Sequence, residues 1–132
     1  MYLVDTSVWI DYLEGRRTEV AGRLQEILDL GLPYGITGVI YQEVLQGVSS
    51  AREFESLSIY LGLQHFYHPE DPVESYREAA RIYFECRRAG VTVRSAADCL
   101  ISRVAVENDL ILLHDDRDFT RIAGVVADLK LA

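Results

Sequence analysis

The chain has 132 residues and a formal net charge of −8, with 49% hydrophobic and 26% charged residues. This composition excludes a disordered chain and is typical of a compact globular protein, for which we expect one domain over residues 1–132. The excess of 21 acidic over 13 basic residues argues against a protein that holds nucleic acid by its overall charge. A bound divalent cation could still serve phosphate groups locally.

The opening residues and the cysteines indicate where the protein works. The stretch MYLVDTSVWIDYL has no basic segment and carries two acids, so we do not expect a signal peptide. No apolar run is long enough to span a membrane. Cys86 and Cys99 lack the spacing of a metal site and are expected as buried thiols. We therefore predict a cytoplasmic protein with no membrane partner.

Hydrophobic periodicity predicts short strands that alternate with helices. In chain order the predicted elements are a strand at 2–5, helices at 6–15 and 18–31, a strand at 33–37, helices at 38–48 and 52–63, a strand at 64–68, helices at 71–90 and 95–109, a strand at 110–114, a helix at 116–123 and a possible last strand at 125–129. We expect Pro72 at the first position of the fifth of these helices and Gly90 at its end. The alternation predicts an α/β fold with a doubly wound, mainly parallel sheet of four to five strands, flanked by helices on both faces.

Acidic side chains recur where these strands end. Asp5 is the last residue of the first predicted strand, Asp116 follows the fourth, and Glu43 lies about one turn into the helix after the second. Because the carboxyl ends of parallel strands share one edge of a sheet, we expect these three side chains to lie together. Asp98 lies in the first turn of the helix that leads into the fourth strand, and such a helix normally begins near the same edge.

Four carboxylates at one edge repel one another. Two unit charges 4 Å apart repel by about 4 kcal/mol at an effective dielectric constant of 20, whereas a helix N-terminus returns only about 0.3–1 kcal/mol for each charge. A hard divalent cation offsets more, because carboxylate oxygens are its preferred ligands. The stretch LILLHDDRDF adds further to the crowding, with Asp115, Asp116 and Asp118 within four positions. The acids therefore predict a Mg²⁺ or Mn²⁺ site.

Each acid also has a purely structural interpretation. Asp5 is placed to cap the helix that follows it, and Asp98 has the spacing of a capping box. Glu43 alone would be read as a surface glutamate, although its neighbours are apolar, and Asp115 and Asp118 as cap and turn residues. Only the joint placement of the acids predicts a functional site.

The stretches LVDTSVWIDYL, TGVIYQEVLQGV, SAADCLISRVAVEND and LILLHDDRDFTRIA together resemble PIN domains and, among them, the VapC toxins of type II toxin–antitoxin systems. The resemblance covers nearly the whole chain in order, and its first and last stretches are the most specific. Position by position, the acidic quartet of the family falls on Asp5, Glu43, Asp98 and Asp116. Asp118 matches a position that is often acidic but less strict.

The resemblance implies a Mg²⁺- or Mn²⁺-dependent endoribonuclease that cuts a defined RNA, often transfer or ribosomal RNA. It also implies a homodimer that is silenced by a cognate VapB-type antitoxin, in a heterotetramer or a larger assembly. Four aromatic residues recur on predicted helices, and some are expected to line a groove for an antitoxin helix or a dimer interface: Trp9, Tyr12, Tyr41 and Tyr60.

The roles of the acids follow from metal-assisted hydrolysis. Three of them are assigned as metal ligands: Asp5, Asp98 and Asp116. Glu43 is assigned to orient the attacking water or a second metal, and water as the nucleophile predicts a product with a 5′-phosphate. The hydroxyls of Thr6 and Ser7, at the start of the first helix, are candidates for contact with a phosphate.

Other classes remain open. A phospho-receiver domain is also doubly wound around an acidic Mg²⁺ pocket, but it needs a lysine near that pocket, and the only lysine, Lys130, is almost the last residue. A phosphatase with an Asp-x-Asp nucleophile needs that pair after the first strand, where this chain has VDTS. A binding domain that keeps the fold without catalysis is the third alternative.

Overall fold

The computed structural model describes all 132 residues as five short strands and seven helices. The strands are β1 (Tyr2–Val4), β2 (Tyr34–Ile36), β3 (His65–Phe66), β4 (Ile111–Leu113) and β5 (Lys130–Leu131). They form one sheet in the order β3-β2-β1-β4-β5, and every pairing is parallel. The chain therefore winds outward from β1 in both directions, which confirms the predicted doubly wound α/β fold.

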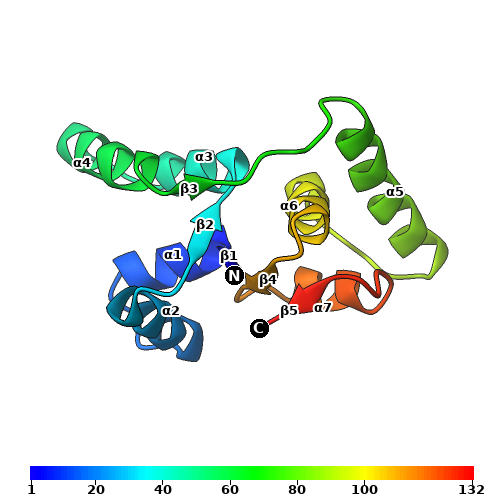
Figure 1. Ribbon diagram of the computed structural model, residues 1–132, viewed down its shortest axis with the longest axis horizontal. Coiled ribbons are helices and arrows are strands. Elements are labelled where there is room, and N and C mark those ends of the chain that lie inside the picture. Colours follow the sequence, from blue (N-terminus) through cyan, green and yellow to red (C-terminus); the bar gives the residue numbers. More distant parts are fainter.

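The helices divide into two groups around the sheet. They are α1 (Thr6–Leu13), α2 (Glu19–Leu30), α3 (Gly38–Gln46), α4 (Ala51–Gly62), α5 (Glu74–Arg88), α6 (Ala96–Glu107) and α7 (Arg117–Ala123). Figure 1 shows α1 to α4 gathered around β1 to β3, with α6 and α7 beside β4 and β5 and with α5 outermost. None of these helices is both long and apolar enough to span a bilayer.

The predicted last strand at 125–129 is wrong. The backbone N–H groups of Val125 and Val126 both donate to the Ile122 carbonyl, at 2.9 and 2.8 Å, so the segment forms turns that continue from α7. The chain needs this segment to return to the level of β4, and it pairs only afterwards, with Lys130 opposite Ile111.

The predicted start of the fifth helix is also wrong. Pro72 lies in a turn before α5, because Asp71 Oδ1 accepts hydrogen bonds from the N–H groups of Val73 at 2.8 Å and Glu74 at 2.6 Å. These two bonds resemble those of a helix cap. The backbone of Val73 is not helical, however, with φ of −121° and ψ of −54°, so α5 begins only at Glu74. The end of the helix agrees with the sequence, since Gly90 follows it in the left-handed conformation with φ of 74°.

The core lies between the sheet and both groups of helices. Trp9 of α1 and Phe119 of α7 are the largest fully buried side chains, and they follow the neighbouring strands β1 and β4. Cys86 and Cys99 are buried and unpaired, as predicted. Burying the inner faces of α1 and α7 in this way fixes the residues at the start of each helix close to the carboxyl edge of the sheet.

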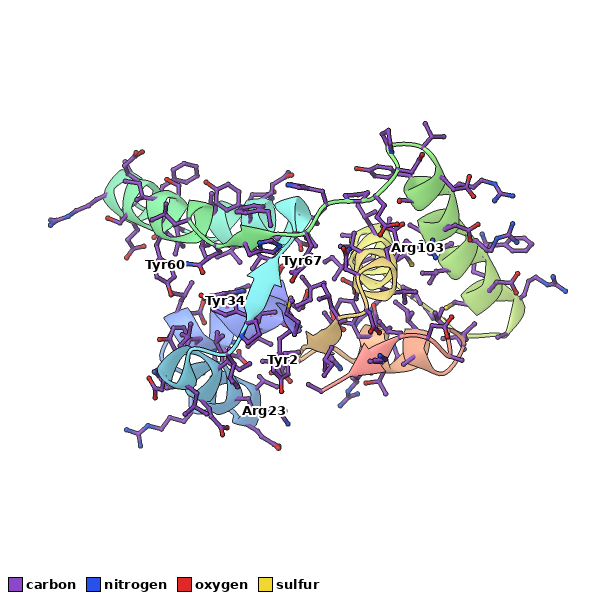
Figure 2. All side chains as sticks on the ribbon, in the orientation of Figure 1. Tyr2, Arg23, Tyr34, Tyr60, Tyr67 and Arg103 are labelled. Carbon is purple, nitrogen blue, oxygen red and sulfur yellow. The ribbon has the colours of Figure 1, made fainter.

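The four aromatic residues singled out in the sequence differ in their burial and in the rings that they contact. Trp9 is buried, and its ring lies 6.1 Å from that of Tyr34 and 6.5 Å from that of Tyr60, which remains exposed. Figure 2 shows Tyr34 of β2 and Tyr60 of α4 close together. Tyr41 packs edge-on against Phe66. Of the set, Tyr60 offers the most surface to another molecule.

Candidate metal centre

Asp5 stands between β1 and α1 and belongs to the start of the helix. Its backbone is extended, and its Oδ2 accepts hydrogen bonds from the Ser7 N–H at 3.1 Å and the Ser7 Oγ at 2.6 Å. The capping interpretation of Asp5 is therefore correct. The residue is nevertheless only 4% exposed, and burial raises the pKa of its carboxyl to about 6. A cap on a solvated helix end would not carry that penalty.

The two hydroxyls after Asp5 hold acids in place. Thr6 Oγ1 donates to Glu43 Oε1 at 2.8 Å, which ties the start of α1 to α3. Ser7 Oγ donates to Asp5 and accepts from the backbone N–H of Asp115 at 2.9 Å, which ties α1 to the loop after β4. Each hydroxyl proton is thus engaged with a carboxylate, and contact with a phosphate stays a prediction.

Asp98 at the start of α6 is the least satisfied acid of the chain. It is 7% exposed, and its Oδ2 is buried without any hydrogen-bond donor. The Ser95 side chain makes no capping hydrogen bond, so the capping-box interpretation of Asp98 finds no support. Burial raises the pKa of the Asp98 carboxyl to about 7. Four other carboxylates act in the same direction: Asp5, Asp116, Asp118 and Glu43.

The start of α7 completes the cluster. Asp116 is the N-cap of α7, and its Oδ1 accepts a hydrogen bond from the Asp118 N–H at 2.9 Å. Carboxylate oxygens of Asp98, Asp116 and Asp118 lie within 4.8 Å of one another. The structure thus brings together three acids at the starts of α1, α6 and α7 and Glu43 from the second turn of α3.

Asp118 is more than the turn residue that its sequence position suggests. It is 2% exposed, and its oxygens accept hydrogen bonds from the Arg94 backbone N–H at 3.1 Å and the Arg121 Nη1 at 3.0 Å. Unlike Asp98, this carboxylate is neutralised from within the chain. The spacing of three residues to Arg121 on one helix is a visible signal for this pair, but Arg94 precedes α6 and carries no such signal.

Asp115 is exposed and pairs with an acid that the sequence did not single out. A hydrogen bond with the Asp11 side chain raises the pKa of Asp115. Asp11 in turn accepts from Arg16 Nη1 at 3.2 Å and Thr18 Oγ1 at 3.1 Å. Because Arg16 supplies the positive charge, this pair needs no cation, which separates it from the cluster around Asp98.

Lys130 lies at the wrong edge of the sheet for a phospho-receiver pocket. It forms an ion pair with Asp109, the residue two positions before β4 begins, and it stands opposite Ile111, the first residue of β4. The acids gather at the other end of β4, after Leu113. The acidic cluster therefore lacks the nearby lysine that a receiver pocket needs, as the sequence indicated.

The donor set of the cluster fits a hard divalent cation. All members are carboxylates, which Mg²⁺ and Mn²⁺ prefer, and the cluster is largely buried. A buried acceptor without a donor is rare in proteins and calls for an explanation. A cation at Asp98 supplies one, because it would satisfy Oδ2 and remove the repulsion that raises the pKa of this carboxyl.

Comparison with known proteins agrees with the geometry. A family model of the PIN domain matches residues 2–125. The chain is 31% identical to VapC ribonuclease Mb1587 of Mycobacterium bovis over 126 residues, which cover 95% of this chain and 93% of that relative. Ribonuclease VapC11 of Mycobacterium tuberculosis matches to the same extent.

Solved structures show the same fold at lower identity. The chain superposes on a VapBC2 structure from Rickettsia felis with a TM-score of 0.72 at 16% identity, covering 99% of this chain and 96% of that one. The FitAcB structure from Neisseria gonorrhoeae gives a TM-score of 0.66 at 20% identity with the same coverage. Family model, relatives and fold agree along nearly the whole chain, so this protein belongs to the PIN domain family, where it groups with the VapC ribonucleases.

Proposed function

We propose that the protein is a Mg²⁺- or Mn²⁺-dependent endoribonuclease and the toxin of a VapBC-type toxin–antitoxin module. The observation that carries this proposal is the buried Oδ2 of Asp98, an acceptor without a donor that faces other carboxylates. The names of the relatives, which are ribonucleases, support the same activity. A catalytically inactive binding domain would have no use for a buried group of this cost.

The acids divide into metal ligands and an orienting residue. Asp5, Asp98 and Asp116 would hold the cation, which when bound supplies a water of lowered pKa and stabilises charge on the leaving oxygen. Glu43 orients the attacking water. Its Oε1 is fixed by Thr6 at 2.8 Å, while its other oxygen has no protein donor and is free to accept from water. Asp118, held by two arginines, keeps Asp116 in place through its backbone N–H.

The proposed reaction is tested by the ends of the product. Hydrolysis by water leaves a 5′-phosphate and a 3′-hydroxyl, because the 2′-hydroxyl of RNA takes no part. We expect wild-type protein with Mg²⁺ or Mn²⁺ to produce these ends, and neither EDTA-treated protein nor the Asp5→Ala variant to cleave. Mass spectrometry of the ends on a defined transfer or ribosomal RNA gives the readout. A 2′,3′-cyclic phosphate formed in EDTA would contradict the proposal.

An apolar groove suits the proposed antitoxin. It has a volume of about 630 Å³ between α1, α3 and α4, and its apolar wall includes Ile10, Leu13, Val44, Val48, Leu57 and Tyr60. Glu14 and Glu53 also line it. An amphipathic helix with basic flanks complements both features. Two structural neighbours are named as pairs of this type: VapBC-1 from Haemophilus influenzae and FitAB bound to a DNA fragment.

The antitoxin proposal is tested by co-expression with the product of the adjacent gene. We expect a stable complex by light scattering, and we expect Leu57→Arg to weaken it by placing a charge in the groove. Gln25→Arg, at an exposed position of α2 outside the groove, is the matched control because it adds the same charge. No complex with wild-type protein, or equal complex formation by both variants, would contradict this assignment.

The homodimer is also a proposal. Helix α5 exposes Tyr76, Tyr83 and Phe84, and aromatic residues are enriched in protein interfaces. Sedimentation of the protein alone should then give twice the chain mass of 15.0 kDa. A monomer at micromolar concentration would contradict it.

A further inference from the structure

A polar hollow lies beside the acidic cluster and has no part in the proposed metal centre. It measures about 640 Å³ and is lined by Gly90, Val91, Thr92, Arg94, Arg117 and Arg121. Three of its six residues are arginines, although the chain has only 13 basic residues and a net charge of −8. Positive charge concentrated against the overall sign indicates a site for an anion.

The walls of the hollow come from two separate segments. One wall is the connection from α5 to α6, which Gly90 starts with its left-handed backbone. The other is α7, where Arg117 and Arg121 are four positions apart and so lie on one face of the helix. Figure 1 shows the connection running beside α7. Because α7 carries Asp118 and the connection leads directly into α6, which carries Asp98, the hollow is fixed relative to the acidic cluster.

Asp118 forms the boundary between the hollow and the acids. Its Oδ1 accepts from Arg121 Nη1 at 3.0 Å, and its Oδ2 lies 3.6 Å from Arg94 Nε. The same carboxylate lies within 4.8 Å of oxygens of Asp98 and Asp116. Arg94 and Arg121 therefore contact a carboxylate that itself borders the atoms that would face the scissile phosphate.

The arginines keep donors free for a ligand. A guanidinium carries five N–H groups, and Arg94 and Arg121 each turn only one nitrogen of it toward Asp118, with side chains 71% and 44% exposed. Arg117 is exposed and forms no ion pair or hydrogen bond. The planar fork of a guanidinium matches two oxygens of a phosphate.

We propose that this hollow binds a backbone phosphate of the RNA strand next to the phosphodiester that is cut, with Arg117 as its principal free donor. The inference rests on the proposed ribonuclease function and adds to it a substrate contact outside the metal centre. A phosphate held there sets the register of the strand without reading a base. The positive charge of the arginines also offsets the repulsion between the RNA strand and a protein whose net charge is −8.

The test measures RNA binding apart from cleavage. Full-length Asp98→Asn protein, which we expect not to cleave, is titrated with a fluorescent single-stranded RNA over a range of salt concentrations. Arg117→Gln is added to this background, with Arg23→Gln as the matched control. Both changes remove one exposed arginine, and Figure 2 shows Arg23 on α2, far from α7.

We expect Arg117→Gln to weaken binding about three- to tenfold and to reduce the slope of log K against log salt by about 0.7, the value for one phosphate contact on a single strand. Arg23→Gln should change neither. In the cleaving protein, Arg117→Gln should raise KM for RNA and leave kcat within about twofold.

The possible failures are distinguishable. Equal affinity and slope for the two variants, or no RNA binding at all, would overturn the phosphate site, whether or not the wild type cleaves RNA. An Arg117-dependent slope in a protein without metal-dependent cleavage would support the phosphate site and reject the nuclease. If Arg117→Gln left RNA binding unchanged and weakened only the antitoxin complex, the hollow would be a protein-docking surface, which contradicts the proposal.

Discussion

Helix α6 carries a buried carboxyl group at each end, and the two groups behave in opposite ways. Asp98 at its start has an oxygen without a donor, and burial raises its pKa to about 7. The Glu107 side chain at its end is only 3% exposed, yet its pKa is lowered. Glu107 accepts from Arg103 Nε at 3.0 Å, the Glu70 N–H at 3.0 Å and the Ser75 hydroxyl.

The hydrogen-bond donors around each carboxyl distinguish a structural acid from a functional one. Burial disfavours the charge of both groups, and the donors around Glu107 more than compensate for it. Around Asp98 the chain supplies further negative charge instead. An acid that lacks donors of its own depends on a positive charge from outside the chain, which is the role we assign to the cation.

Substitution of Asp98 should reduce RNA cleavage strongly, whereas substitution of Glu107 should not. Asp98→Asn should reduce RNA cleavage by about a hundredfold or more, because it removes a metal ligand. The Glu107→Gln variant, where it folds, should cleave RNA at a rate within about threefold of the wild type, because residue 107 lies far from the reacting atoms. Initial rates, with circular dichroism to verify folding, give the comparison. An equal loss in both variants would remove the functional distinction.

The two substitutions should also change the stability of the protein in opposite directions when no metal is bound, and the Glu107 variant should be the less stable one. Glu107→Gln should lower the free energy of unfolding by about 2–3 kcal/mol, since it leaves Arg103 without its buried partner. Urea denaturation measures the change. An unaltered midpoint would show that the donors around Glu107 contribute nothing.

Divalent metal should stabilise the wild type, and this stabilisation should depend on Asp98. At a concentration 100 times its Kd, Mg²⁺ or Mn²⁺ should raise the free energy of unfolding by about 2.7 kcal/mol. Glu107→Gln should keep this increase and Asp98→Asn should lose most of it. Thermal melting with and without metal measures both, and a melting temperature that ignores the metal in the wild type would count against the site.

The pH dependence without metal is the smallest and most specific effect. The pKa of Asp98 rises from 3.8 in the unfolded chain to about 7 in the folded protein, so the folded state keeps a proton that the unfolded state has released. This contribution to stability is complete below about pH 4 and is lost as the pH rises through about 7. Asp5 acts in the same direction.

Asp98→Asn should remove that loss, and at about pH 8 in EDTA it should be more stable than the wild type by about 1–2 kcal/mol. Glu107, with its lowered pKa, contributes stability that is present above its ordinary pKa and lost in acid. Melting curves across this range measure both trends. A wild type that becomes more stable from about pH 5 to pH 8 without metal would contradict the raised pKa of Asp98.

Much of the fold could be predicted from the sequence, because the alternation of strands and helices is carried by hydrophobic periodicity. The errors occur where periodicity carries no signal. β5 has only two residues, and its position depends on its pairing with β4. The start of α5 depends on two hydrogen bonds of the Asp71 side chain.

The grouping of the acids could also be predicted, since three of them follow strands that end at one edge. The donors around them could not. The contacts of Asp118 with Arg94 and of Asp115 with Asp11 each join a helix to a loop that only the folded chain brings close to it. The lack of a hydrogen-bond donor at Asp98 Oδ2 could not be predicted either, because the sequence suggested that Asp98 and Ser95 form a capping box.

Mn²⁺ binding, followed by electron paramagnetic resonance in the absence of RNA, shows whether the acidic cluster at the start of α6 holds a metal ion. We expect the wild type and Glu107→Gln to bind Mn²⁺ with similar affinity, and Asp98→Asn to bind it at least about tenfold more weakly. Equal binding by all three proteins, or none by the wild type, would show that the carboxylates at the start of α6 do not hold the ion.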